Sequence, residues 1–181
     1  MSNRILPLAF LLLPTLAMGG KEYEPRSPSG NIVTEINAGK ELSYSVSYDG
    51  KPVLAPSRLS MTLSDGREVP GSDVKVRKVS RSSEDAVILS PLYRQSEVRD
   101  HYNALTIQLS QGWEVQFRAY DDGVAYRFVT TAKKPFEVAT ETVEYVFPSD
   151  YTMTVPYVRS GNDGDLNSQF FNSFENTYTT V

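Results

Sequence analysis

Few side chains in this sequence could carry out chemistry, and the single histidine is the first to consider. The chain has one His and no Cys, so Cys–His catalysis and a metal site with two histidines are excluded. A Ser-His-Asp arrangement would have to use His101, which lies between Asp100 and Tyr102 just before a predicted strand. We interpret His101 as a surface or strand-end residue. No glycine pattern for nucleotide binding occurs either.

Carboxylates are the next candidates, and the segment Asp163-Gly164-Asp165-Leu166-Asn167 places oxygen ligands at the spacing of a calcium loop. Ser168 stands where the template needs Gly, and Phe174 stands where it needs the last acidic ligand. The segment therefore fails as a complete EF-hand loop, and a polar, solvated loop is the favoured interpretation.

Three further acids differ in their surroundings. Asp121 and Asp122 are adjacent in a predicted turn, where they would point apart and hold the turn by side-chain to backbone hydrogen bonds. Glu175 instead lies in an apolar run with Phe174 and Tyr178. Because an unpaired charge is costly to bury, Glu175 must be exposed, paired or bound to a cation. The residues alone leave these three options open.

Tyrosine is abundant, with 11 in the chain. Aromatic faces can stack on sugar rings, but tyrosines that alternate with valine and leucine are also typical of a sandwich core. The composition therefore permits carbohydrate binding without indicating it.

The elements that must position these residues are predicted to be strands. Trp113 to Phe128 reads WEVQFRAYDDGVAYRF, in which two alternating runs flank an Asp-Gly hairpin signal. This hairpin brings together an aromatic face and a polar face that carries Arg118 and Arg127. No run of ten or more residues has a helical period, which predicts an all-β, antiparallel β-sandwich. The other strands are predicted around residues 42–48, 59–63, 74–76, 86–89, 105–109, 142–147 and 152–158.

The chain divides into three predicted parts. Residues 1–20 are typical of a signal peptide, because Arg4 precedes an uncharged apolar run that ends with small residues; a buried N-terminal helix is the alternative. Residues 21–30 contain two prolines and predict a linker or an extended lead-in segment. Residues 31–181 form the predicted sandwich. We therefore expect an exported, periplasmic or extracellular protein without a membrane span once the signal is removed.

The composition argues against two classes of binding partner. The net charge is −4 and no basic cluster occurs, which argues against nucleic acid or an anionic membrane surface as a partner. Without cysteine the fold cannot use disulfides, and about 160 residues are enough to bury a core without them.

Four segments together resemble a known family in their order and spacing. They are SPSGNI at Ser27–Ile32, SYSVSYDGKPVLAPSRLSMTL at Ser43–Leu63, FRAYDDGVAYRF at Phe117–Phe128 and FENTYT at Phe174–Thr179. The chain resembles the N-terminal domain of glycoside hydrolase family 97, whose members are exported α-glucosidases and α-galactosidases.

The resemblance implies a galactose-mutarotase-like super-sandwich packed against a C-terminal (β/α)8 barrel. In the family the barrel carries the catalytic acid and the base or nucleophile, and a calcium ion lies in the active site. The sandwich supplies one glutamate ligand to this calcium, and the matching position here is Glu175. The implied partners are the barrel of the same polypeptide and an oligosaccharide substrate.

Residues 1–181 contain no segment that matches the family's barrel, so we expect both catalytic carboxylates to lie outside this sequence. The positioned carboxylate pair that glycoside hydrolysis requires is therefore absent, and we expect the sandwich to be incomplete at its C-terminus. Two hypotheses remain. The chain is the N-terminal part of an α-glycosidase that shapes the active-site rim and supplies a calcium ligand, or it is a stand-alone, non-catalytic carbohydrate-binding sandwich. Residues of this chain decide neither the sugar preference nor an inverting or retaining mechanism.

Overall fold

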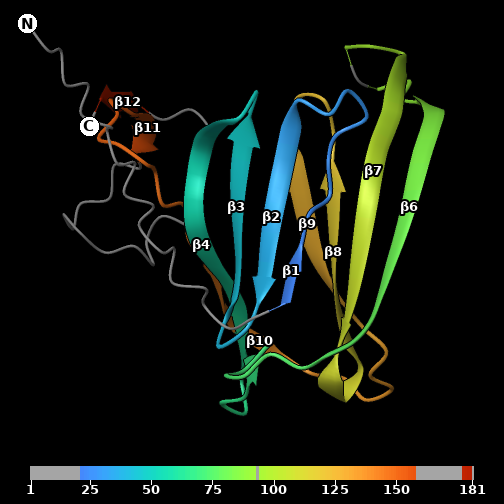
Figure 1. The fold of residues 1–181 in the computed structure, drawn as a ribbon, viewed down its shortest axis with the longest axis vertical. Coiled ribbons are helices and arrows are strands. Elements are labelled where there is room, and N and C mark those ends of the chain that lie inside the picture. Colours follow the sequence, from blue (N-terminus) through green and yellow to red (C-terminus); the bar gives the residue numbers. More distant parts are fainter. Residues whose placement is uncertain (1–20, 93, 158–176, 181) are drawn as a thin grey trace, which may run out of the picture.

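The computed structural model describes residues 21–92, 94–157 and 177–180, which form two facing antiparallel sheets and a small third sheet (Figure 1). The first sheet has the order β1-β2-β3-β4-β10, and β5 pairs with β4 at one end. Its strands are β1 (Lys21–Tyr23), β2 (Ile32–Ala38), β3 (Leu42–Tyr48), β4 (Lys51–Leu63), β5 (Glu68–Val69) and β10 (Val138–Val143).

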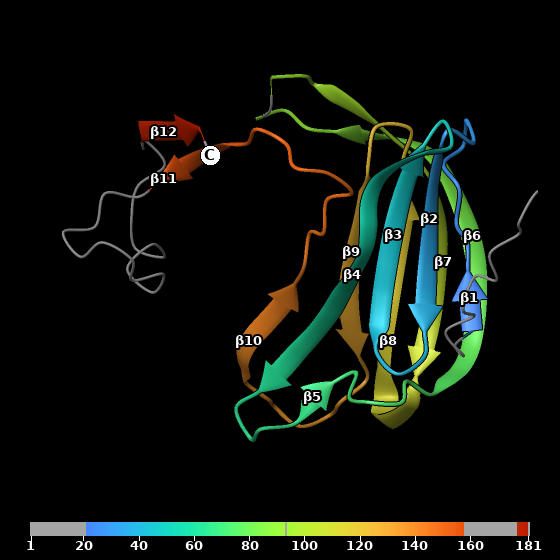
Figure 2. The ribbon, with the colours of Figure 1, turned by 60° about the vertical axis from the view of Figure 1, so that its left-hand side comes forward.

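The second sheet is a meander in which each strand pairs with the next along the chain. Its order is β6-β7-β8-β9, with β6 (Val76–Leu89), β7 (Glu97–Leu109), β8 (Trp113–Ala119) and β9 (Val124–Thr130). A 3-10 turn, η1 (Ser110–Gly112), connects β7 to β8. Figure 2 shows β2, β3 and β4 in front of β7, β8 and β9, so that the two sheets form two layers. The predicted antiparallel β-sandwich is confirmed.

A third, two-stranded sheet consists of β11 (Thr154–Tyr157) and β12 (Thr177–Thr180). It lies apart from both layers in the two ribbon views (Figures 1 and 2).

The core lies between the two large sheets. In β8 every second side chain, from Trp113 to Ala119, is buried, as period-2 alternation predicts for a strand with one covered face. Phe117 and Ile36 are fully buried from opposite sheets, and Tyr44 packs against Phe117 with ring centroids 6.1 Å apart. Because the core contains large apolar side chains from both sheets, it needs no disulfide.

The predicted hairpin at β8 and β9 is confirmed, and so are its two faces. Tyr120 donates its backbone N–H to Gly123 O over 2.8 Å, which closes the turn around Asp121 and Asp122. Tyr126 and Phe128 pack on the core side, whereas Arg127 lies on the opposite, exposed face.

Other segments have bounds that differ from the predicted ones. Residues 21–30 contain β1, which pairs with β2, and an isolated bridge joins Arg26 to Val33, so this segment is extended and bonded to the first sheet. The strand expected at 142–147 is instead β10 at 138–143, an edge strand whose side chains are mostly exposed and therefore lack an apolar alternation. The apolar run 86–89 is the exposed end of the longer strand β6.

Within the described part of the chain, no helix has the length and apolar character needed to cross a bilayer. The predicted signal peptide, residues 1–20, lies outside the described residues.

Candidate functional site

A groove of about 540 Å³ lies where β3 and β4 face β9. It is rich in tyrosine, and its edge is formed by exposed side chains such as Tyr48, Val53 and Tyr145. The residues that line it are Ile32, Tyr44, Val46, Tyr48, Val53, Leu54, Asp122, Gly123, Val124, Ala125, Tyr126 and Tyr145. The groove is therefore an apolar surface with phenol groups and one carboxylate.

The two inner tyrosines are held in their neutral form. The Tyr126 hydroxyl donates a hydrogen bond of 2.7 Å to Glu141 of β10, and burial, followed by this contact, raises the pKa of Tyr126 well above its ordinary value. Burial and then the nearby Tyr145 also raise the pKa of Tyr44. Both phenols remain protonated at neutral pH and can act only as hydrogen-bonding groups, not as bases.

The groove combines aromatic and apolar side chains with one carboxylate. Hydrolysis needs two carboxyl groups about 5 to 9.5 Å apart that flank the bond. Among the described residues that line the groove, Asp122 is the single carboxylate. The aromatic rings and apolar side chains are suited to a sugar face or to an apolar side chain.

A second polar cluster lies on the outer face of the second sheet. The Arg118 guanidinium stacks over the Tyr102 ring, 4.1 Å from its centroid, and donates to the Tyr120 hydroxyl over 3.2 Å. Tyr120 in turn donates to Asp100 over 3.1 Å. The hydrogen bond to Tyr120 raises the pKa of Arg118 above its ordinary value, although burial opposes it. This cluster is the polar face that the hairpin predicted, and its groups bond mainly to one another.

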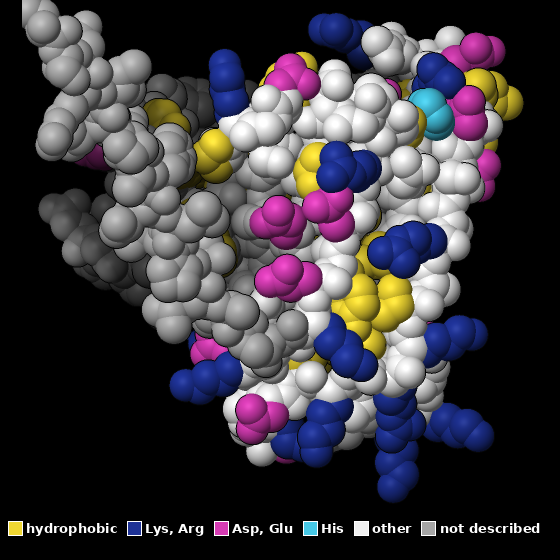
Figure 3. Space-filling model, in the orientation of Figure 1, with side chains coloured by type: hydrophobic (Ala, Val, Ile, Leu, Met, Phe, Trp, Pro, Cys, Tyr) yellow, Lys and Arg dark blue, Asp and Glu magenta, His cyan; other side chains and the backbone are white. Residues whose placement is uncertain are grey.

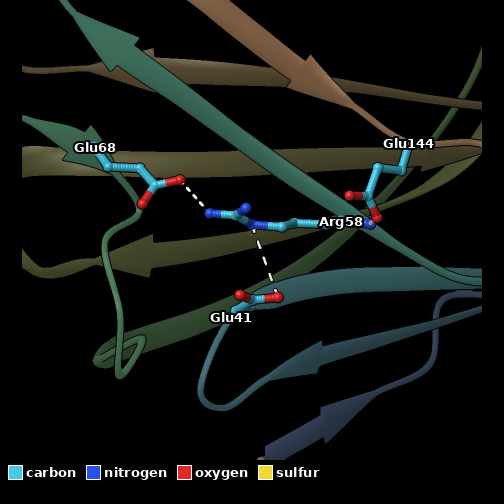
Figure 4. A network of polar contacts seen from close by, with 4 residues as sticks. All are labelled: Glu41, Arg58, Glu68 and Glu144. Carbon is cyan, nitrogen blue, oxygen red and sulfur yellow. Dashed lines mark hydrogen bonds and ion pairs between the residues drawn. The ribbon is translucent and has the colours of Figure 1, made fainter.

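A third cluster surrounds Arg58 of β4 (Figure 4). Its guanidinium pairs with Glu68 of β5 and lies 3.8 Å from Glu41, at the turn between β2 and β3, while its backbone N–H donates to Glu144 over 3.0 Å. Because Glu68 and Glu41 meet its side chain and Glu144 meets its backbone, Arg58 joins β4 to three other segments. The cluster is therefore a structural tie.

The prediction that Asp121 holds its own turn is wrong. Its carboxylate does not hold its own turn; it accepts the backbone N–H of Ser29, 92 positions away, over 2.8 Å. This hydrogen bond from the Ser29 backbone, followed by the Ser29 hydroxyl, lowers the pKa of Asp121. Ser27 and Ser29 also contact each other through their hydroxyls, 3.1 Å apart. Two segments that carry the family resemblance, SPSG and DDG, are therefore bonded to each other.

His101 lies inside β7, not before a strand. The strand begins earlier than predicted because Glu97–Tyr102 continues the pairing with β6, where Asp85 stands opposite His101. Asp85 makes two hydrogen bonds with Arg99, of 2.8 and 2.9 Å, and these lower its pKa. His101 is half-buried within the strand, so it is not a strand-end residue, and no serine hydroxyl is hydrogen-bonded to it among the described residues.

The charged side chains are unevenly spread over the face seen in Figure 3. Lys and Arg gather around its lower end, and Asp and Glu lie over its centre. This face therefore carries both signs of charge.

The predicted metal ligand Glu175 and the loop Asp163–Asn167 lie outside the described residues. Among residues 21–92, 94–157 and 177–180 no group of three or more His, Asp or Glu side chains could hold a metal ion.

Sequence reasoning missed two contacts, the Tyr126–Glu141 bond and the Arg58 cluster. Their partners lie 15 or more positions apart or on separate strands, so no local spacing could reveal them. The available signal was Arg58 itself, the one charged residue between Pro52 and Leu63 of β4.

The fold and sequence match known proteins over most of the chain. The glycosyl-hydrolase 97 N-terminal family matches residues 26–181. A retaining α-galactosidase of Bacteroides thetaiotaomicron is 53% identical over 177 residues, which are 96% of this chain and 27% of that protein.

Solved structures agree in fold. A glycoside hydrolase family 97 enzyme of Pseudoalteromonas sp. strain K8, in complex with acarbose, has a TM-score of 0.70 at 24% identity, over 88% of this chain and 24% of that one. A β-arabinopyranosidase has a TM-score of 0.66 at 26% identity, over 75% and 23%. The chain therefore spans about a quarter of the length of these relatives.

Proposed function

Because the chain belongs to the glycoside hydrolase family 97 N-terminal domains, we propose that it is the N-terminal sandwich of an exported, calcium-dependent α-glycosidase. In this proposal the sandwich shapes the rim of an active site whose catalytic carboxylates lie in a (β/α)8 barrel of the same polypeptide. An α-galactoside is the proposed substrate class.

The observation that carries this proposal is the 53% identity with a retaining α-galactosidase, which extends over nearly the whole chain. The relative is several times longer, which leaves room for a catalytic domain beyond the matched part.

Glu175 is the proposed calcium ligand of this chain. A glutamate carboxylate is a hard oxygen ligand of the kind that Ca²⁺ prefers, and a cation would balance its charge within the apolar run of residues 170–178. Because Ca²⁺ takes about six to eight oxygen ligands, Glu175 would share the ion with other ligands of the complete protein. The bound ion would supply positive charge to the active site.

The test is Glu175→Gln in the complete enzyme. The substitution keeps the side-chain volume but removes the anionic ligand, so we expect calcium affinity and α-galactoside hydrolysis to fall by roughly tenfold or more while the melting temperature of the calcium-free protein is unchanged. Calorimetric calcium titration and hydrolysis rates are the measurements. The matched control is Glu84→Gln, an exposed glutamate of β6. Wild-type calcium affinity in Glu175→Gln would refute the ligand assignment.

The tyrosine-lined groove supports a second candidate function, a non-catalytic carbohydrate-binding sandwich. Titration of the 181-residue chain with galactose-containing oligosaccharides distinguishes the two. Saturable binding that Tyr48→Ala abolishes would favour this second candidate.

A further inference from the structure

A small hollow lies on the outer face of the second sheet, where β8 pairs with β9. Its volume is about 170 Å³, and it is lined by Gln116, Arg118, Tyr120, Ala125, Tyr126 and Arg127. The register of the hairpin places Arg118 opposite Ala125, and Arg127 follows two positions later on β9. Arg118 and Arg127 are therefore diagonal neighbours, roughly 7–8 Å apart, and the methyl group of Ala125 is too short to fill the space between them. We call this feature the arginine hollow.

Both arginines are already oriented by their neighbours. The Arg118 guanidinium stacks on the Tyr102 ring and donates to the Tyr120 hydroxyl. The Arg127 Nε–H donates to Gln116 Oε1 over 2.9 Å. Because a guanidinium carries several N–H donors, these bonds leave others to each arginine for a ligand. A ligand would therefore cost these side chains little further conformational entropy.

The arginine hollow is positively charged, because no acidic residue is among the described residues that line it. Asp100 lies 3.9 Å from Arg118, outside the lining. Glu114 accepts a hydrogen bond from Gln116 over 3.4 Å and also lies outside it. In the part of the chain that the structure describes, Arg127 makes no ion pair with a carboxylate. An anion in the hollow would therefore meet a guanidinium charge that no acid balances.

The size and the chemistry of the hollow indicate the kind of ligand. Guanidinium groups match the paired oxygens of a carboxylate or a phosphate, and such charge-assisted hydrogen bonds are stronger than neutral ones. Pockets for whole small molecules usually measure about 300–1,000 Å³, so a hollow of about 170 Å³ has room for one anionic group. The rest of the ligand would lie over the sheet. There the Tyr120 oxygen, which accepts from Arg118, keeps a second lone pair that can accept from a sugar hydroxyl.

We propose that the arginine hollow binds the anionic group of an acidic sugar, either a carboxylate or a phosphate ester. The inference rests on the proposed function only in taking the ligand from the sugars. Its test measures binding to this chain and needs neither calcium nor hydrolysis, so a failure here leaves the test of Glu175 unaffected.

The experiment is a calorimetric titration of the 181-residue chain. The probes are galacturonate, galactose 6-phosphate, neutral galactose and inorganic phosphate. We expect saturable binding of an acidic sugar that weakens as salt is added, and binding of galactose that is at least about tenfold weaker. The tighter of the two acidic sugars identifies the anionic group.

Three results of this titration would overturn the proposal. The first is that neither acidic sugar binds saturably, and the second is that galactose binds as tightly as they do. The third is that inorganic phosphate binds as tightly as the tighter acidic sugar, which would show a site for an adventitious ion only.

Two variants test the hollow itself. Arg127→Gln removes one guanidinium, and Ala125→Leu fills the space between the arginines while both remain. Each should weaken binding of the tighter acidic sugar by roughly tenfold or more. Arg77→Gln is the matched control, because Arg77 is an exposed arginine of β6 outside the lining. Since Arg77, Ala125 and Arg127 are all exposed, we expect the three variants to keep the melting temperature of the unchanged chain. If Arg127→Gln and Ala125→Leu bind as tightly as Arg77→Gln, the arginine hollow is not the site.

Discussion

β6 and β8 both pair with β7, yet they differ in burial along almost their whole length. β8 alternates between buried and half-buried positions, whereas β6 is exposed at most positions, including Val87 and Leu89. The difference follows from what faces them, because the first sheet covers β8 and the C-terminal half of β7 but not the outer half of the β6–β7 hairpin (Figure 1). Hydrogen bonding to a neighbour therefore defines a strand, but only a second layer makes it part of the core.

The largest expected effect lies in the covered strand. Phe117→Ala should reduce the free energy of unfolding by about 3–5 kcal/mol, because the ring is fully buried between the sheets and its removal leaves a cavity. Val87→Ala on the uncovered strand should change it by no more than about 0.5 kcal/mol. Urea unfolding of the two variants measures both values. Similar losses would show that the β6 arm is part of the cooperative core.

A smaller effect is expected where β9 meets β10. Tyr126→Phe removes the hydrogen bond to Glu141 and should cost about 1 kcal/mol of stability, since both partners are partly open to water. Tyr145→Phe is the matched control, because its ring is largely exposed. A Tyr126→Phe protein as stable as the control would show that this hydrogen bond does not stabilise the sandwich.

The smallest expected effect concerns the exposed aspartates Asp121 and Asp85, whose variants should differ in melting temperature at pH 7. The pKa of Asp121 is lowered in the folded chain by its bonds to Ser29, so its stabilising contribution is present above the unfolded pKa of about 3.9 and is lost as the pH falls through the folded value. Asp121→Asn should therefore lower the melting temperature at pH 7, and its difference from the wild-type chain should shrink as the pH falls through the folded pKa.

Asp85→Asn provides the comparison. Asp85 also has a lowered pKa, from its hydrogen bonds to Arg99, but the pair joins only β6 to β7 on the uncovered arm. We expect no measurable change in melting temperature at pH 7 because the arm can fray without global unfolding. A loss equal to that of Asp121→Asn would show that the arm is coupled to the sandwich.

The sequence predicted the strands better than it predicted which of them are buried. The alternation of Trp113, Val115 and Phe117 indicated both a strand and its buried face, because burial and period coincide there. The run at 86–89 has similar apolar character but is exposed, since nothing in local sequence tells which strand will be covered.

The candidate site was harder to predict than the fold. The resemblance, not the spacing of residues, selected Glu175, and that position stays a prediction. The groove could not be predicted, because it combines Tyr48 and Val53 of the first sheet with Val124 and Tyr126 of the second, and only the packing of the sheets brings them together. The role of Asp121 was wrong for the same reason, since its partner is distant in the chain.

The return of β10 to the first sheet has a consequence for the order of folding. The second sheet joins strands that follow one another along the chain, so its turns can close soon after each strand is made. The first sheet cannot be completed in this way, because Leu59 of β4 pairs with Val143 of β10. In the chain β10 comes after all the strands of the second sheet. During synthesis the β4 edge therefore stays open until all four strands of the meander have emerged, and this is the interval in which a chaperone would most benefit the chain.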